Sequence, residues 1–83
     1  MLETLRNSSK TIGVKQSYKA VESGIAKLVF IAKDGDEKVV SGIKELCEKN
    51  RIEVVYVESM KQLGKACGIG VGAAAACLLT DKQ

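Results

Sequence analysis

The feature that most constrains the fold is a pair of β-rich segments separated by a helical pattern. KLVFIA (residues 27–32) and EVVYVE (residues 53–58) are rich in β-branched and aromatic residues. Between them, residues 36–50 place apolar side chains three and four positions apart, as on one face of a helix. A strand, a crossover helix and a second strand form a βαβ unit. We therefore expect the two strands to be parallel, with a right-handed crossover.

Three further helices and two further strands are predicted around this unit. Residues 2–10 predict a weak short helix and residues 11–14 a brief extended segment, and KQSYKAVESG (residues 15–24) predicts a helix that stops at Gly24. Apolar residues with helical spacing are expected on its core side: Val14, Tyr18 and Val21.

The second half of the chain predicts one more helix and one more strand. Ser59 and Gln62 have the spacing of a capping box, so a helix is expected from Met60 to Gly68. A glycine-rich loop follows, and AAACLLT (residues 74–80) predicts the last strand. Helices and strands alternate over a single domain of 83 residues, which predicts a three-layer α/β/α sandwich.

The apolar run from Ala66 to Leu79 could be a membrane segment or a nucleotide-binding glycine loop, and the sequence argues against both. It has 14 residues, against about 20 needed to cross a bilayer. Its glycines follow a predicted helix, and their spacing fits neither a Walker loop nor a dinucleotide fingerprint. No secretory signal is visible, so we expect a cytoplasmic protein without membrane contact.

Cysteine and histidine content argues against metal and redox chemistry. Cys47, Cys67 and Cys77 form no CxxC pair, and the chain has no histidine, which removes the usual zinc ligands and the commonest general base. We expect three reduced, buried thiols, no cofactor and no enzymatic activity.

Charge is distributed unevenly along the chain. The net charge is +3, yet residues 1–19 hold four basic side chains and one acidic one, residues 61–83 hold three and one, and the middle is acidic. If the two ends meet in space, one face is positive, which suits an anionic partner such as nucleic acid. An ordinary mixed surface is the alternative.

Two stretches are candidate binding segments. On a helix, Lys15, Gln16 and Lys19 lie within roughly 100° of one another, near a helix N-terminus that also offers backbone N–H groups. Lysine donates to the O6 and N7 atoms of guanine as well as to phosphate. Ile69 and Val71 project from the glycine loop, where they either pack against an unstacked base or fill the rim of the core. A merely solvated helix face is the alternative for the lysines.

Together these stretches resemble the kink-turn-binding ribosomal proteins of the L7Ae and L30e type, most closely the small bacterial members. The resemblance covers roughly residues 3–80 and rests on TIGVKQSYKAVESG, KLVFIAKD and VVYVESMKQLGKACGIGVGAAAACLL. It implies an α-β-α sandwich with a four-stranded mixed sheet.

The resemblance also implies site residues. The bacterial-type motif Gly-x-Lys-Gln-x-x-Lys matches Gly13, Lys15, Gln16 and Lys19, whose family counterparts donate to guanines of tandem sheared G·A pairs. The second motif covers a flipped-out nucleotide and matches these residues: Leu63, Gly64, Ala66, Gly68, Ile69 and Val71. Gly70 stands where glutamate is common, and Gly72 where archaeal members have proline.

We therefore expect a monomeric RNA-binding protein that recognises kink-turns, in ribosomal RNA, a riboswitch or another structured RNA, with the ribosome as one potential partner. The expected contact residues are Lys10, Gly13, Val14, Lys15, Gln16, Lys19, Lys65, Ile69, Gly70 and Val71. Two rival functions remain: a protein-interaction module that docks through its apolar loop, and a small enzyme or nucleotide-binding subunit.

Overall fold

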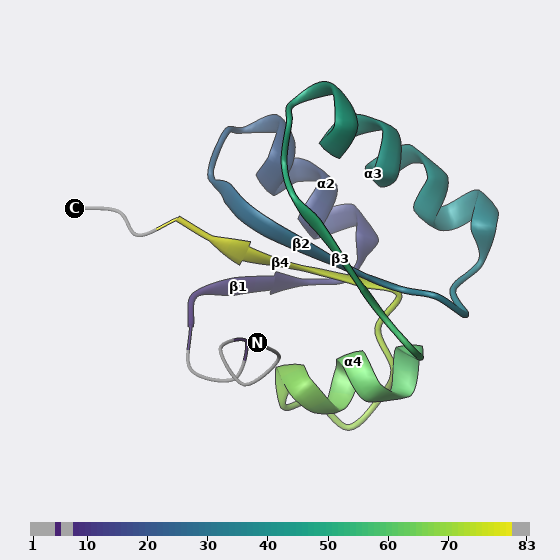
Figure 1. Ribbon diagram of the computed structural model, residues 1–83. Coiled ribbons are helices and arrows are strands. Elements are labelled where there is room, and N and C mark those ends of the chain that lie inside the picture. Colours follow the sequence, from purple (N-terminus) through teal and green to yellow (C-terminus); the bar gives the residue numbers. More distant parts are fainter. Residues whose placement is uncertain (1–4, 6–7, 81–83) are drawn as a thin grey trace.

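Strands β2 (Ala26–Ala32) and β3 (Val54–Val57) pair in parallel, with α3 (Glu37–Lys49) between them in the chain, as the sequence predicts. This computed structural model describes Leu5 and residues 8–80 (Figure 1). The other elements are β1 (Lys10–Ile12), α2 (Val14–Glu22), α4 (Met60–Cys67) and β4 (Ala75–Leu79). Leu5 is helical, and most of the helix expected over residues 2–10 lies outside the described residues. Its last three residues are not helical, because Ser8 and Ser9 lead into β1, which begins at Lys10.

The four strands form one mixed sheet in the order β1-β4-β2-β3. The central strand β4 is antiparallel to both β1 and β2, with Ile12 opposite Ala76 and Ile31 opposite Ala75. The residues of β4 are mostly buried, because the strand has helices above and below it. The expected four-stranded mixed sheet is confirmed.

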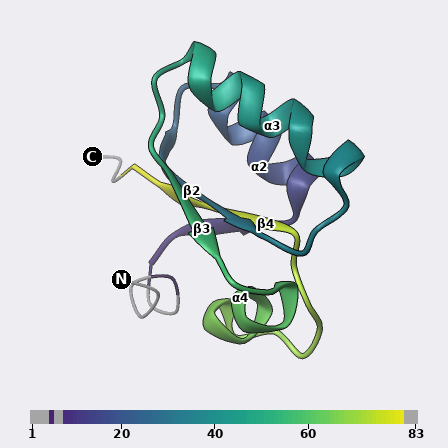
Figure 2. The same cartoon turned by 45° about the vertical axis from the view of Figure 1, so that its right-hand side comes forward.

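Helices cover both faces of the sheet, so the predicted three-layer sandwich is also confirmed. Helices α2 and α3 lie on one face and α4 on the other (Figures 1 and 2). Alternation along β2 feeds both layers: Leu28 and Phe30 pack on the α4 side, and Val29 and Ile31 on the α2–α3 side. A strand buried on both faces reads as a continuous apolar run, which explains the composition of KLVFIA.

Local signals place the helix ends. The Ser59 hydroxyl accepts a hydrogen bond from the Gln62 amide at 3.1 Å, as expected for an N-cap. Gly24 and Gly68 have left-handed φ angles of 78° and 84°, and each closes a Schellman motif. The apolar run from Ala66 to Leu79 is therefore divided among a helix end, a loop and a strand. Within the described residues, no helix has the length and apolarity needed to cross a bilayer.

The prediction that Tyr18 lies on the core side of its helix is wrong, and Tyr56 does not lie in the core either. The inner face of α2 consists of Ser17, Ala20 and Val21, while the side chain of Tyr18 is exposed. Small residues let the helix approach the sheet closely, a contribution that a search for large apolar residues overlooks. Tyr56 belongs to the edge strand β3 and is 49% exposed, because the helical layer does not extend over this edge.

The three cysteines are buried free thiols, as expected. Burial raises the pKa of the Cys77 thiol to about 11, and the neighbouring Cys47 adds to this shift. Burial likewise raises the pKa of Cys47 and of Cys67. Because the thiolate is the reactive form, we infer that all three are inert in the folded protein at neutral pH.

The pKa of Cys77 makes stability depend on alkaline pH. From the ordinary value of 9.0 up to about 11, the unfolded thiol loses its proton while the folded thiol keeps it. The free energy of unfolding should therefore fall as the pH rises through this window. Urea titrations at pH 8 and at a pH near 10.5 should show a larger loss in the native chain than in Cys77→Ala. Equal losses in the two proteins would contradict this assignment.

Candidate nucleic-acid interface

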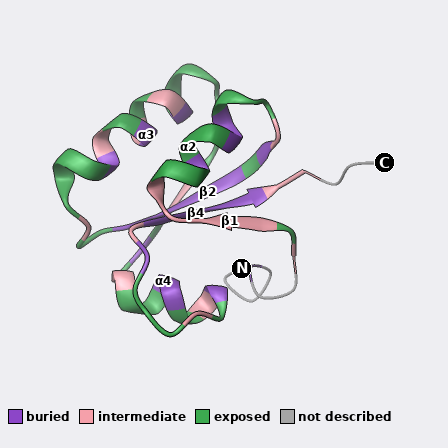
Figure 3. Cartoon of the chain, turned by 180° about the vertical axis from the view of Figure 1, so that it is seen from behind, coloured by how far each residue is buried: buried purple, intermediate pink, exposed green. Residues whose placement is uncertain are grey.

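The two candidate segments meet at one end of the sheet. The Gly13 amide, at the start of α2, donates to the Ala75 carbonyl oxygen at 2.8 Å, where the glycine-rich loop enters β4. The loop is held from the other side by the Ala73 amide, which donates to the Met60 carbonyl at 3.0 Å. Residues about 60 positions apart in the chain are therefore brought to one sheet edge, with α2 and the loop on opposite sides of it (Figure 3).

The N-terminus of α2 is not capped in the usual way. Gly13 is its N-cap, with φ 102° and ψ 155°, and supplies no side-chain acceptor. The first intrahelical bond runs from the Ser17 amide to the Gly13 carbonyl at 3.0 Å, so the preceding amides of the first turn have no helical partner. By contrast, α3 is capped by the Asp36 carboxylate.

Charge in the first turn of α2 also departs from the usual preference. A helix N-terminus favours acidic side chains, and Glu37 occupies the first turn of α3. The first turn of α2 has no acidic residue and instead carries Lys15. Like charge at this end costs about 0.3–1 kcal/mol, and local rules are most often broken at functional sites. An anionic ligand would remove this repulsion.

The predicted contact side chains of α2 share an exposed surface. Lys15, Gln16 and Lys19 are exposed, and the opposite side of the helix packs on the sheet. Among Leu5 and residues 8–80, the ion pairs are Lys33–Glu58 and Lys44–Glu37, so neither lysine of α2 is neutralised within this part of the chain. Val14 is half-buried and packs against the α2–α3 core. It is placed to support the helix more than to contact a ligand with its side chain.

A pair of hydroxyl groups anchors α2 to β1, a feature that sequence reasoning missed. Ser17 is fully buried, and its Oγ lies 3.1 Å from Oγ1 of Thr11 in β1. This bond links the helix to the strand directly beneath it. The one sequence signal is that Ser17, Ala20 and Val21 have the i, i+3, i+4 spacing of an inner helical face.

Glycine allows the loop of the second motif to lie on α4. Gly64 is buried, and a Cβ atom there would overlap the Val71 carbonyl oxygen and lie 3.0 Å from Cα of Gly72. A Cβ atom on Gly72 would lie 3.2 Å from the backbone of Met60. Helix and loop are thus in backbone contact. The sequence places Gly64 in a motif, whereas only the structure shows why a side chain is excluded.

The loop divides its two apolar side chains between the core and solvent. Ile69 is half-buried against the α4-side core, so it fills the core rim. Val71 is 72% exposed at the surface, and the flanking Gly70 and Gly72 are exposed as well. Ile69 therefore matches the alternative in which the loop residue fills the core rim, whereas Val71 presents its side chain to solvent.

Lys10 and Lys65 lie on the α4 side of the sheet. Lys10 is half-buried in β1, two residues from Ile12, which packs into the α4-side core. Its ammonium group lowers the pKa of Cys67, which burial raises, so it lies near the C-terminal end of α4. Lys65 is exposed in the last turn of that helix. Lys10 and Lys65 therefore extend the positive charge from α2 to the C-terminal end of α4, where the glycine-rich loop begins.

The geometry defines a small α/β/α sandwich protein. At one end of its sheet, the start of α2 and the glycine-rich loop form a basic edge. A family model described as "Ribosomal protein L7Ae/L30e/S12e/Gadd45 family" matches residues 2–83. The chain belongs to this family, which confirms the resemblance noted from the two motifs.

Known proteins similar to this chain include two bacterial relatives and one solved structure. An RNA-binding protein of Caldanaerobacter subterraneus is 51% identical over 67 residues, covering 81% of this chain and 82% of the relative. An RNA-binding protein of Halalkalibacterium halodurans is 48% identical, with the same coverage. The structure of a Giardia lamblia 15.5kD RNA binding protein has a TM-score of 0.90 and 27% identity, covering 98% of this chain and 72% of the other.

Proposed function

We propose that this protein binds RNA and recognises kink-turns without catalysing a reaction. One observation carries the proposal: the bond between Gly13 and Ala75 places the uncapped, basic start of α2 beside the loop that exposes Val71. Membership of the L7Ae/L30e/S12e/Gadd45 family and the names of the two bacterial relatives support the RNA part of the proposal.

Each residue of the edge has a proposed role. Gln16 and Lys19 donate to guanine acceptor atoms, and Lys15 contacts a base or a phosphate. Gly13 lets the RNA approach the backbone of the first turn. Val71, with the Gly70 backbone beside it, covers the extruded nucleotide, and Ile69 supports the loop from below.

The chemistry of a kink-turn fits this edge. A regular A-form major groove is too deep and narrow for side chains, whereas bulges and non-canonical pairs open it. A sharp bend also brings phosphates together, and lysines at positions 10, 15, 19 and 65 would offset their repulsion. The described aromatic side chains form no stacking platform at this edge. Phe30 is buried, Tyr56 lies in the opposite edge strand, and the exposed Tyr18 lines a hollow with residues of α3.

The deciding experiment is a titration of the protein against a kink-turn RNA at several salt concentrations. The control RNA has the sheared G·A guanines replaced so that a regular duplex forms. Tight binding to the first RNA and weak, salt-sensitive binding to the second would support the proposal. Equal weak binding to both RNAs would leave only a generic basic surface, and absence of binding would favour the protein-interaction alternative.

Lys19→Ala should weaken binding to the kink-turn RNA by about 1–3 kcal/mol, because it removes a base contact. Lys27→Ala is the matched control, since it removes the same charge from an exposed lysine of β2 at the opposite end of the sheet. Isothermal titration calorimetry on both variants, with circular dichroism to verify folding, measures the difference. Equal affinity losses in the two variants would mean that only net charge matters.

A further inference from the structure

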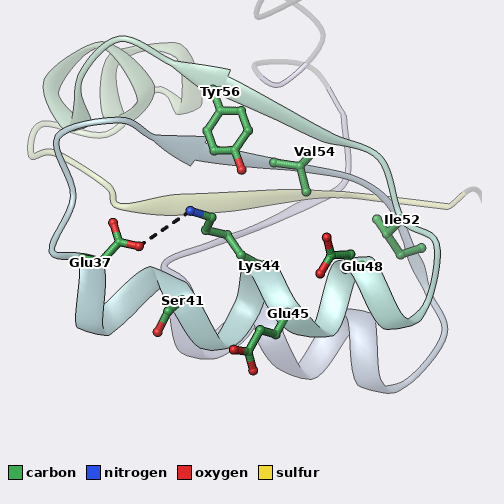
Figure 4. Close-up of a pocket in the computed structure, with 8 residues that line it drawn as sticks. All are labelled: Glu37, Ser41, Lys44, Glu45, Glu48, Ile52, Val54 and Tyr56. Atoms are coloured by element: carbon green, nitrogen blue, oxygen red, sulfur yellow. Dashed lines mark ion pairs between the residues drawn. The ribbon is translucent and has the colours of Figure 1, made fainter.

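A groove lies along the other edge of the sheet, between α3 and the edge strand β3 (Figure 4). Its volume is about 430 Å³. It is lined by Glu37, Ser41, Lys44, Glu45, Glu48, Ile52, Val54 and Tyr56. None of these residues belongs to the proposed RNA interface, which is formed by the start of α2 and the loop between α4 and β4.

The charge of this groove is opposite to that of the molecule. Its lining holds three carboxylates, from Glu37, Glu45 and Glu48, and one ammonium group, from Lys44, whereas the whole chain has a net charge of +3. RNA phosphates would be repelled here, and basic side chains would be attracted. The side wall is apolar, formed by Ile52, Val54 and the half-exposed ring of Tyr56.

The backbone of β3 offers a template beside the groove. The Glu53 and Val57 carbonyls accept hydrogen bonds from the β2 side, at 3.1 Å and 2.7 Å. Because backbone groups alternate along a strand, the N–H and C=O groups of Val54 and Tyr56 point away from β2. Their side chains lie on the α3 side, in the groove. Residues 54–57 include no lysine or proline, the residues that commonly protect an exposed edge.

We propose that β3 and this groove bind an extended, basic segment of a partner protein, in which arginine or lysine alternates with apolar residues. The segment adds to the sheet as a fifth strand, and its alternate basic side chains reach Glu45 and Glu48. An incoming guanidinium replaces Lys44, whose Nζ lies 5.8 Å from the centroid of the Tyr56 ring. Lys44 keeps its second partner, Glu37, at 3.7 Å.

The test uses a defined probe, an eight-residue peptide of alternating arginine and valine with blocked ends, followed by amide chemical shifts of the full chain. Shifts confined to α3 and β3 are expected. A glutamate–valine peptide of the same length should give none. Methylation of the peptide nitrogens that face β3 should weaken binding about tenfold or more, because strand hydrogen bonds are lost.

The matched variants separate groove charge from net charge. The double variant Glu45→Gln/Glu48→Gln should bind the probe about three- to tenfold more weakly, the range for two partly exposed ion pairs. Glu22→Gln, at the far end of α2 and outside the groove, should leave the affinity unchanged. Kink-turn binding by the double variant should be unaltered, so the two proposals fail independently.

Three outcomes would overturn the proposal. One is the absence of shifts at about 1 mM peptide, a concentration that detects even a millimolar Kd. Another is equal affinity of the native chain and the double variant. The third is a concentration-dependent shift of the same residues without peptide, which would show that a second copy of the chain occupies the groove.

Discussion

Gly64→Ala is expected to destabilise the fold by about 1–3 kcal/mol, the usual cost of inserting a methyl group into a closely packed site. The added Cβ would occupy the position of the Val71 carbonyl oxygen, so the loop must move away from α4. Because Val71 is the residue proposed to cover the extruded nucleotide, the affinity for kink-turn RNA should fall as well, about tenfold or more. Urea denaturation measures the first effect and calorimetry the second.

Gly42→Ala is the matched control for this substitution. Gly42 also lies in a helix, α3, and a Cβ atom there would have no neighbour within 4 Å. Helix propensity alone should therefore make Gly42→Ala stabilising, by about 0.5–1 kcal/mol. Stability changes of opposite sign would show that the loop contact determines the effect at Gly64. A stabilising effect of Gly64→Ala would show that the loop is not held against α4.

Gly13→Ala is expected to cost about 1–3 kcal/mol of stability for a different reason. No atom would contact the added Cβ, but the φ of 102° and ψ of 155° belong to a region that only glycine adopts readily. The chain must rotate to relieve this strain, and the first turn of α2, with Lys15 and Gln16, must move with it. We expect the affinity for kink-turn RNA to fall about tenfold, because guanine contacts depend on donor direction.

Gly24→Ala separates lost stability from lost recognition. Gly24 also has a positive φ, 78°, and open space around it, but it ends α2 at the opposite end from Gly13. A left-handed alanine costs about 1–2 kcal/mol, so this variant should be destabilised similarly. Its RNA affinity should equal that of the native chain. If both variants bind RNA normally once folded, then the conformation of Gly13 has no part in recognition.

Local patterns were sufficient to predict the elements and their layers. The apolar run of β2, the helical spacing of α3 and the cap at Ser59 act over a few residues, so their physics is readable from neighbours in the chain. The exposed face of Lys15, Gln16 and Lys19 follows from helical geometry in the same way. The two motifs indicated the family, and the resemblance to the family implied a four-stranded sheet with both parallel and antiparallel pairs.

Features that depend on contacts between distant residues could be seen only in the tertiary structure. Burial of Tyr18 was predicted wrongly because α2 approaches the sheet through Ser17 and Ala20, and the partner of that serine, Thr11, lies on another element. Exposure of Tyr56 depends on β3 being an edge strand, which no residue of β3 itself encodes.

The helices and strands of this chain, their caps and its exposed basic face thus depend on short-range preferences of its residues. For this reason they could be predicted directly from the sequence. The division of Ile69 and Val71 between core and solvent could not, because it depends on the backbone contact between Gly64 and Val71. The acidic groove was not predicted either, because it depends on how α3 packs beside β3 and on the position of β3 at the edge of the sheet. Packing brings together residues whose separation in the chain carries no local signal, and the proposed binding surfaces consist of such residues.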